Sequence, residues 1–276
     1  MHPENIKLAS LAKKMGAKIW AVQETLVSNS RKSEFYIDKV NAYTKFPQWL
    51  PLFIRYKLVW LRKWIGHIYY YWTLRAGKSS RILRRGCSGM RDADIQTYLC
   101  EEQKKIFLEN GVPESKLIYN PFFVKKPKKP LEKIITILVP SENEGGIDRI
   151  TGEFIPYQKQ LERWIALSRI IVEKYPKYEI YFKFHPNTKN YDNYLAQYFK
   201  GLCFKDRKWA GLCIDKASII IGLPPSFSTL LYQASVEYPW KKIISLDIGN
   251  EMFGDYFKGY KNIKVITDIN KLWKMI

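Results

Sequence analysis

The second half of the chain alternates short, β-branched apolar runs with stretches whose apolar positions recur every three or four residues. The apolar runs predict strands at Ile134–Val139, Tyr178–Phe184, Leu202–Phe204, Ser218–Gly222, Lys242–Ile248 and Ile263–Ile266. The helical spacing predicts helices at Tyr157–Lys174, Tyr191–Phe199, Phe227–Val236 and Asp268–Met275. This alternation indicates an α/β fold with a doubly wound parallel sheet.

The first half shows the same pattern less completely. A helix is predicted over Asn5–Met15, ended by Gly16, and a strand over Ala17–Gln23. Strands at Asp94–Cys100 and Leu117–Asn120 flank a helix at Glu101–Asn110. No strand precedes the first helix, so we expect this domain to be incomplete at its start, through truncation or degeneration. A second chain that supplies the missing strands stays open, as does a homo-oligomer.

A basic, proline-rich stretch separates the two halves. KKPKKP at 125–130 cannot form a regular element, because proline lacks the backbone N–H and fixes φ. We therefore predict a partial N-terminal domain at 1–124, a linker at 125–130 and a C-terminal domain at 131–276.

The segment 45–91 differs in character from the rest. It contains 11 Lys and Arg residues, no Asp or Glu, and ten aromatic residues (Phe, Trp and Tyr together). Residues 52–64 can form one helix with aromatic rings along one face. Aromatic rings mixed with cationic side chains are typical of proteins that lie on anionic membranes. An ordinary core helix with a solvated basic face, or a nucleic-acid surface, would have a similar composition.

The net charge indicates the kind of partner, and the cysteines indicate the cellular compartment. The net charge is +20, and residues 1–130 carry 25 Lys and Arg against 10 Asp and Glu. This favours an anionic partner of the first half, a membrane rather than nucleic acid, because no nucleic-acid-binding motif is present. Four cysteines without CxxC spacing predict neither a zinc site nor a disulfide scaffold, which favours a reducing cytoplasm. No signal peptide and no spanning helix are predicted.

Polar residues follow two of the predicted strands. FKFHP ends the strand at Tyr178–Phe184, and GLPPSFST follows the strand at Ser218–Gly222. Ligands of open α/β sheets bind at such carboxyl ends, and a helix N-terminus with hydroxyl groups favours anions. We expect a phosphate-bearing ligand between these two turns.

These motifs resemble the C-terminal, donor-binding domain of two-domain Rossmann-type (GT-B) glycosyltransferases. The likeness is to bacterial sialyltransferases and Kdo transferases of surface-polysaccharide synthesis, which carry a His-Pro after a central strand and a Ser/Thr-rich turn before a helix. It covers residues 131–276, and 93–121 is similar in rhythm to the end of their N-terminal domain. The resemblance implies two Rossmann-like domains and an inverting, metal-independent sugar transfer, with a CMP-sugar as one donor, onto a glycan or lipid-linked acceptor. It implies no cofactor and no metal.

The expected site residues follow from these motifs and this resemblance. The donor-binding residues are Ser141, Asn143, Gly145, Lys183, His185, Pro186, Gly222, Ser226, Ser228 and Thr229. The candidate catalytic residues are Glu24, Asp94 and His185, with Glu24 or Asp94 as the base that deprotonates the acceptor. The residues expected at the inner membrane face are Trp49, Trp60, Arg62, Lys63, Trp64, Arg84 and Arg85.

Each residue has a plainer reading as a core histidine, a helix cap or a solvated loop carboxylate. Two other functions therefore stay open. One is a catalytically inactive binding protein of the same fold at the membrane, and the other is a nucleotide-sugar epimerase.

Overall fold

The chain divides into two compact units, Met1–Phe122 and Phe123–Ile276. The computed structural model describes residues 11–22, 42–43, 45–74, 93–109, 112–120, 123–128, 130–140, 146–147, 154–185, 199, 202–204, 207–224, 228–248, 257 and 260–272.

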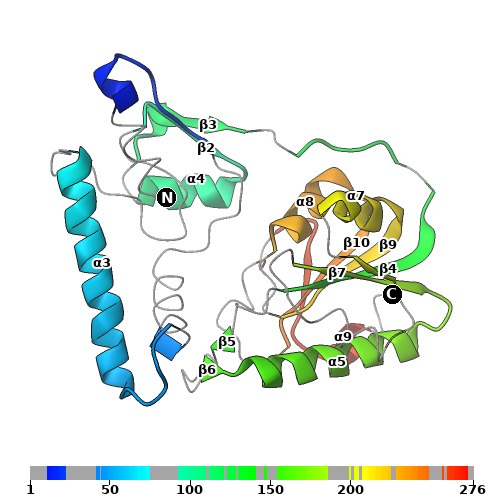
Figure 1. The fold of residues 1–276 in the computed structure, drawn as a ribbon. Coiled ribbons are helices and arrows are strands. Elements are labelled where there is room, and N and C mark those ends of the chain that lie inside the picture. The colour runs from blue at the N-terminus through cyan, green and yellow to red at the C-terminus, as the bar shows by residue number, and fades with distance from the viewer. Residues whose placement is uncertain are drawn as a thin grey trace. The chain divides into compact units, whose positions relative to one another are not determined.

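The second unit is built on a six-stranded parallel sheet (Figure 1). Its strands are β4 (Glu132–Val139), β7 (Glu179–Phe184), β8 (Leu202–Phe204), β9 (Ala217–Gly222), β10 (Lys242–Leu246) and β11 (Lys264–Ile266). They lie in the order β11-β10-β9-β4-β7-β8. Numbered along the chain, this is the 3-2-1-4-5-6 order of doubly wound nucleotide-binding sheets. The predicted parallel, doubly wound sheet is therefore confirmed.

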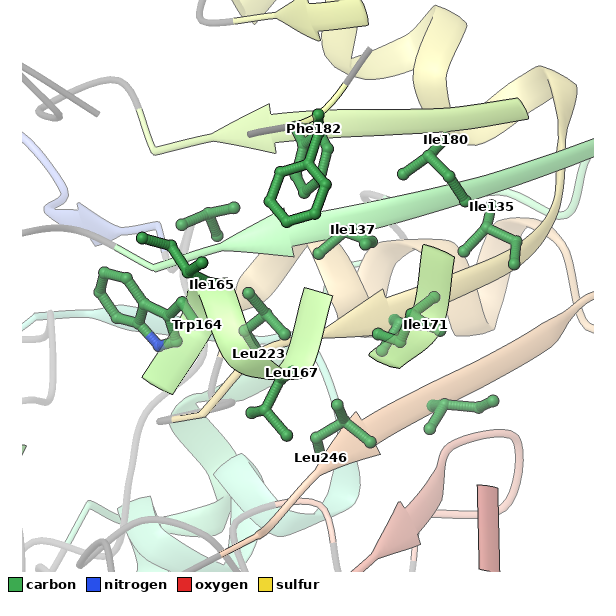
Figure 2. Packing of buried hydrophobic residues seen from close by; sticks show 14 of the residues in the cluster. Ile135, Ile137, Trp164, Ile165, Leu167, Ile171, Ile180, Phe182, Leu223 and Leu246 are labelled. Carbon is green, nitrogen blue, oxygen red and sulfur yellow. The ribbon is translucent and has the colours of Figure 1, made fainter. Parts of the chain in front are cut away.

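Helices cover both faces of this sheet (Figure 1). One face packs against α5 (Tyr157–Lys174) and α9 (Ile269–Leu272), and the other carries α7 (Arg207–Lys216) and α8 (Thr229–Glu237). Strand residues alternate between the faces, so Ile135 and Ile137 meet α5 while the Thr136 hydroxyl donates to the Cys213 carbonyl of α7 at 2.6 Å. Figure 2 shows the α5 face, where Ile165, Leu167 and Ile171 lie over the strands.

Two elements of this unit differ from the sequence expectation. The helix α7 has no counterpart in the prediction, since it runs into β9 without an intervening loop. The stretch Pro140–Phe154, expected as a loop, contributes to an antiparallel pair of short strands, β5 (Gly146–Ile147) and β6 (Phe154–Ile155). The helix expected at Tyr191–Phe199 lies outside the described residues except for Phe199, which is buried in the core.

A buried lysine secures the end of α7. Lys241 donates through Nζ to the carbonyls of Ile214 and Asp215 in the last turn, and the same ammonium lies 4.4 Å from the centroid of the Tyr238 ring. Cations are favourable at helix C-termini because the last carbonyls there have no partner within the helix. Burial raises the pKa of Tyr238 to about 12, with smaller effects of Asp215 and Glu237.

The first unit contains a smaller parallel sheet, ordered β1-β2-β3, of Trp20–Ala21, Ile95–Tyr98 and Leu117–Tyr119. The helix before β1 ends at Gly16, whose φ of 79° allows the amides of Gly16 and Ala17 to reach back to Lys13 and Ala12. The helix α4 (Glu101–Glu109) and a 3-10 turn (Glu114–Lys116) lie between β2 and β3. The helix α3 (Leu52–Leu74) is longer than predicted, and β1 is shorter.

The start of the predicted linker is attached to the second unit. The Lys126 amide donates to the Glu237 carbonyl at the end of α8 at 2.8 Å, and the Phe123 ring meets the Tyr232 ring edge-on. The described residues of 125–130 form no helix or strand, as the prolines predict.

Candidate functional site

The order of strands in the second sheet reverses between β4 and β9. Both strands end at the same edge, because they are parallel and pair in register from Ile135–Ile219 to Leu138–Gly222. Ligands of doubly wound sheets bind outside the carboxyl ends at this reversal, where the two following connections leave in opposite directions. The candidate site is therefore the edge formed by the ends of β4, β7 and β9.

The amino end of α8 lies at this edge. The Ser228 hydroxyl is its N-cap and accepts a hydrogen bond from the Leu230 amide at 3.2 Å, and Thr229 is the first helical residue. The Leu231 amide donates to the Ser228 carbonyl, so the attraction for an anion at this end comes from the positive end of the helix dipole. Gly222 is buried at the end of β9, next to Ser245 of β10 in the register. The described start of α8 is therefore a helix N-terminus of the kind at which proteins bind anions.

Lys183 lies deeper than the sequence indicates. Its side chain is 4% exposed, and Nζ donates to the Phe184 carbonyl at 2.8 Å. The nearby ammonium lowers the pKa of the Cys213 thiol, but burial outweighs it and raises that pKa to about 12. Lys183 therefore lies on the α7 side of the sheet, where its buried ammonium places positive charge close to the carboxyl edge. His185 follows at the end of β7 and is half-buried.

The opposite side of the edge is fixed by a tryptophan. Trp164 of α5 is buried, and its indole N–H donates to the Pro224 carbonyl at 2.5 Å. Figure 2 shows this ring with Leu223, one residue before Pro224. The bond holds the start of the connection from β9 to α8 against α5. The sequence predicts the helix that carries Trp164 but gives no indication of this bond.

Two further polar residues of β10 belong to this neighbourhood and were not predicted. Ser245 is buried, and its hydroxyl has no hydrogen-bond partner among the described residues. Asp247 is buried just beyond the strand, and its amide donates to the Ile266 carbonyl at 2.7 Å. A strand-forming run of apolar residues surrounds both in the sequence, which hides them from pattern analysis.

The structure brings five of the expected donor-binding residues to one edge: Lys183, His185, Gly222, Ser228 and Thr229. The other five lie outside the described residues: Ser141, Asn143, Gly145, Pro186 and Ser226. Glu24 also lies outside them.

Asp94 belongs to the first unit and has a structural partner. Its Oδ2 accepts a hydrogen bond from the Ile19 amide at 2.7 Å, which ties the start of β1 to β2. This bond is the main cause of a lowered pKa of Asp94, and Lys13, Lys116 and Lys18 add to it. A lowered pKa makes this carboxylate a weaker proton acceptor, and its role as a general base stays a prediction.

The helix α3 carries an outward aromatic and cationic stripe. Arg55 and Val59 are buried, whereas the residues on the opposite side of the helix are exposed. The exposed set is Phe53, Lys57, Trp60, Leu61, Trp64 and Ile65. Trp60 is 65% exposed and Trp64 51%, and Trp49 before the helix is 79% exposed. Arg62 is also exposed, no side-chain position is described for Lys63, and Arg84 and Arg85 lie outside the described residues.

The described residues contain neither a candidate spanning helix nor a candidate metal cluster. None of the described helices combines the length and apolar character needed to cross a bilayer. No group of three or more His, Cys, Asp or Glu side chains that could hold a metal ion occurs in the described part of the chain.

Comparison with known proteins gives only weak likenesses, all among solved structures. No family model matches the chain, and no curated protein matches its sequence. The fold is similar, with a TM-score of 0.39 and 13% sequence identity, to the crystal structure of TarM. The likeness covers 96% of this chain and 45% of that protein, so this chain spans less than half of its length. A likeness at this level assigns neither fold nor function.

Proposed function

We propose that this chain is a glycosyltransferase that binds a nucleotide-activated sugar at the carboxyl edge of its second unit. The observation that carries the proposal is the reversal of strand order between β4 and β9, with the amino end of α8 at the same edge. This combination is the common binding arrangement for nucleotides in doubly wound sheets. The resemblance of FKFHP and PPSFSTLLYQAS to sugar-transferase motifs selects the reaction class among nucleotide-binding proteins.

Each residue of the edge has a role in this proposal. The positive end of the α8 dipole and the hydroxyls of Ser228 and Thr229 hold the donor phosphate. Lys183 and His185 supply positive charge, which stabilises the phosphate of the departing nucleotide as negative charge develops on it. A CMP-activated acidic sugar is the proposed donor, and transfer occurs by direct displacement with inversion. Glu24 is the proposed acceptor base.

Calorimetric titration with CMP, UDP, UDP-GlcNAc and a CMP-sugar tests the donor site, with and without magnesium. One nucleotide should bind saturably, and His185→Ala should abolish that binding. Lys177→Ala is the matched control, since Lys177 is exposed just before the opposite end of β7 and should change nothing. Binding of no nucleotide, or equal binding by the two variants, would contradict the assignment.

We also propose that the outward stripe of α3 places the enzyme on an anionic membrane, where lipid-linked acceptors lie. Large aromatic rings settle at the headgroup level of a bilayer, and Lys57, on the same side of α3 as these rings, pairs with lipid phosphates. Arg62 is exposed but lies seven residues after the buried Arg55, on the other side of the helix. The segment Leu52–Leu74 carries no acidic residue that would oppose this contact.

Sedimentation with vesicles tests this surface. The protein should bind vesicles that contain phosphatidylglycerol and not neutral vesicles, and Trp60→Ser with Trp64→Ser should lower binding about tenfold or more. Equal binding of wild type and double variant would remove α3 from the contact.

A further inference from the structure

The first turns of α5 contain a buried amide without a partner. The side chain of Gln160 is 1% exposed, and neither its Oε1 nor its Nε2 has a hydrogen-bond partner among the described residues. Burial of an amide is unfavourable unless both its donor and its acceptor are bonded. A residue of this kind at a candidate ligand site indicates that a ligand supplies the missing partners.

The position of Gln160 places its amide at the carboxyl edge of the sheet. It shares the sheet-facing stripe of α5 with Trp164, which lies one turn further along the helix, and with Leu167 and Ile171. Trp164 already reaches Pro224, beyond the end of β9. Because α5 runs away from the edge, Gln160 lies about 6 Å nearer to the amino end of the helix, and so to the edge, than Trp164 does.

The amino end of α5 also lacks a side-chain cap. Its N-cap is Pro156, which provides no side-chain hydrogen bond, and its first turn contains no acidic residue. The first amides of α5 therefore lack a side-chain cap. An uncapped helix start and a buried, unpartnered amide are two independent features of the same few residues.

We propose that Gln160 recognises the nucleobase of the donor. A primary amide presents a donor and an acceptor side by side, which matches the edge of a base that presents an acceptor next to a donor. The described neighbours on the same helix face, Leu161 and Trp164, are apolar and suit a flat heteroaromatic ring better than a polyhydroxylated sugar. This inference rests on the proposed function, and it assigns the base to α5 and the phosphate to α8.

Calorimetry with CMP, UMP, AMP, GMP and ribose 5-phosphate tests the assignment on the full chain. At least one nucleoside monophosphate should bind more tightly than ribose 5-phosphate, which lacks the base. Gln160→Met has a side chain of similar length without the amide, and it should weaken that nucleotide about 10- to 100-fold. Its affinity for ribose 5-phosphate should not change.

The matched control is Ser168→Ala. Ser168 lies two turns further along the same face of α5, is also buried, and its hydroxyl also has no partner among the described residues. This variant should bind every probe as the wild type does. In the ligand-free protein, Gln160→Met should unfold at the same or a higher temperature, because it removes an unsatisfied amide. Gln160→Asn, which withdraws the amide by one methylene, should weaken the nucleotide as well and replaces Gln160→Met if that variant does not fold.

The outcomes separate the two proposals. If nucleotides bind but the Gln160 variants bind them as tightly as the wild type, or if Ser168→Ala weakens them equally, the role of Gln160 is wrong and the phosphate site stands. If nothing binds, both proposals are wrong. A lower unfolding temperature of Gln160→Met would show that the amide is already paired in the free protein, which also overturns the inference.

Discussion

The bond between Trp164 and Pro224 is the contact of the candidate site that stability measurements can test most directly. Trp164→Phe keeps an aromatic ring but removes the indole N–H that donates to the Pro224 carbonyl at 2.5 Å. Pro224 is buried, so no water replaces the lost donor. A stranded buried carbonyl costs about 1–3 kcal/mol. The void left by the smaller ring adds about 1 kcal/mol.

The expected loss is therefore about 2–4 kcal/mol of the free energy of unfolding, or a fall in Tm of about 5–15 °C. Urea unfolding followed by far-UV circular dichroism measures it. Trp240→Phe is the control for the ring change, because the buried indole nitrogen of Trp240 has no hydrogen-bond partner among the described residues. It should lose at least about 1 kcal/mol less than Trp164→Phe does. Equal losses for the two substitutions would refute the idea that the Pro224 bond stabilises the edge.

Two further predictions concern the frame around the site. Lys241→Met should lower the free energy of unfolding, measured in urea, by about 2–3 kcal/mol, because the carbonyls at the end of α7 lose a charged donor. The control is Lys242→Met at the exposed neighbouring residue, which should change the free energy of unfolding by no more than about 0.5 kcal/mol. Equal losses for the two substitutions would mean that the hydrogen bonds of the buried Lys241 ammonium only offset the free-energy cost of desolvating it. Asp94→Asn should destabilise the protein at neutral pH. Because the pKa of Asp94 is lowered in the folded state, its carboxylate stabilises the fold at every pH above the unfolded-state pKa of about 3.9. Acid titrations of both proteins should converge as the pH falls through the folded pKa, and a constant difference down to pH 2 would contradict this.

The sequence best predicts a helix that buries one face only and has a clear residue at its start. The helix at Tyr157–Lys174 has the predicted bounds, because one face meets the sheet and Pro156 marks its start. The helix α7 escapes prediction for the opposite reason. It ends at Lys216 and β9 begins at Ala217, so no Gly, Pro or polar loop separates two periodicities that run together.

The candidate site could be predicted only in part. The strand-end position of His185 follows from local sequence, since a strand end is a local feature. The helix expected from Phe227 instead begins at Thr229 with Ser228 as its N-cap, because several hydroxyl residues of this stretch can cap a helix. The depth of Lys183 and the burial of Gln160 depend on which helix covers which face of the sheet. A glutamine in an amphipathic helix is ordinarily solvated, so its sequence position carries no sign of the packing that buries it.

The central place of β4 has a consequence for how the second unit folds. The first strand of the unit to be synthesised pairs on one side with β7 and on the other with β9, and the Ser218 hydroxyl that bonds the Ile134 carbonyl lies 84 residues further along the chain. Until β9 arrives, a strand whose last six residues are buried in the folded unit has a free edge that a second molecule can pair with. Pairings of such long sequence separation also slow folding, since a large loop must close before the contact forms. The strand order that forms the candidate site therefore also makes the nascent second unit prone to aggregation.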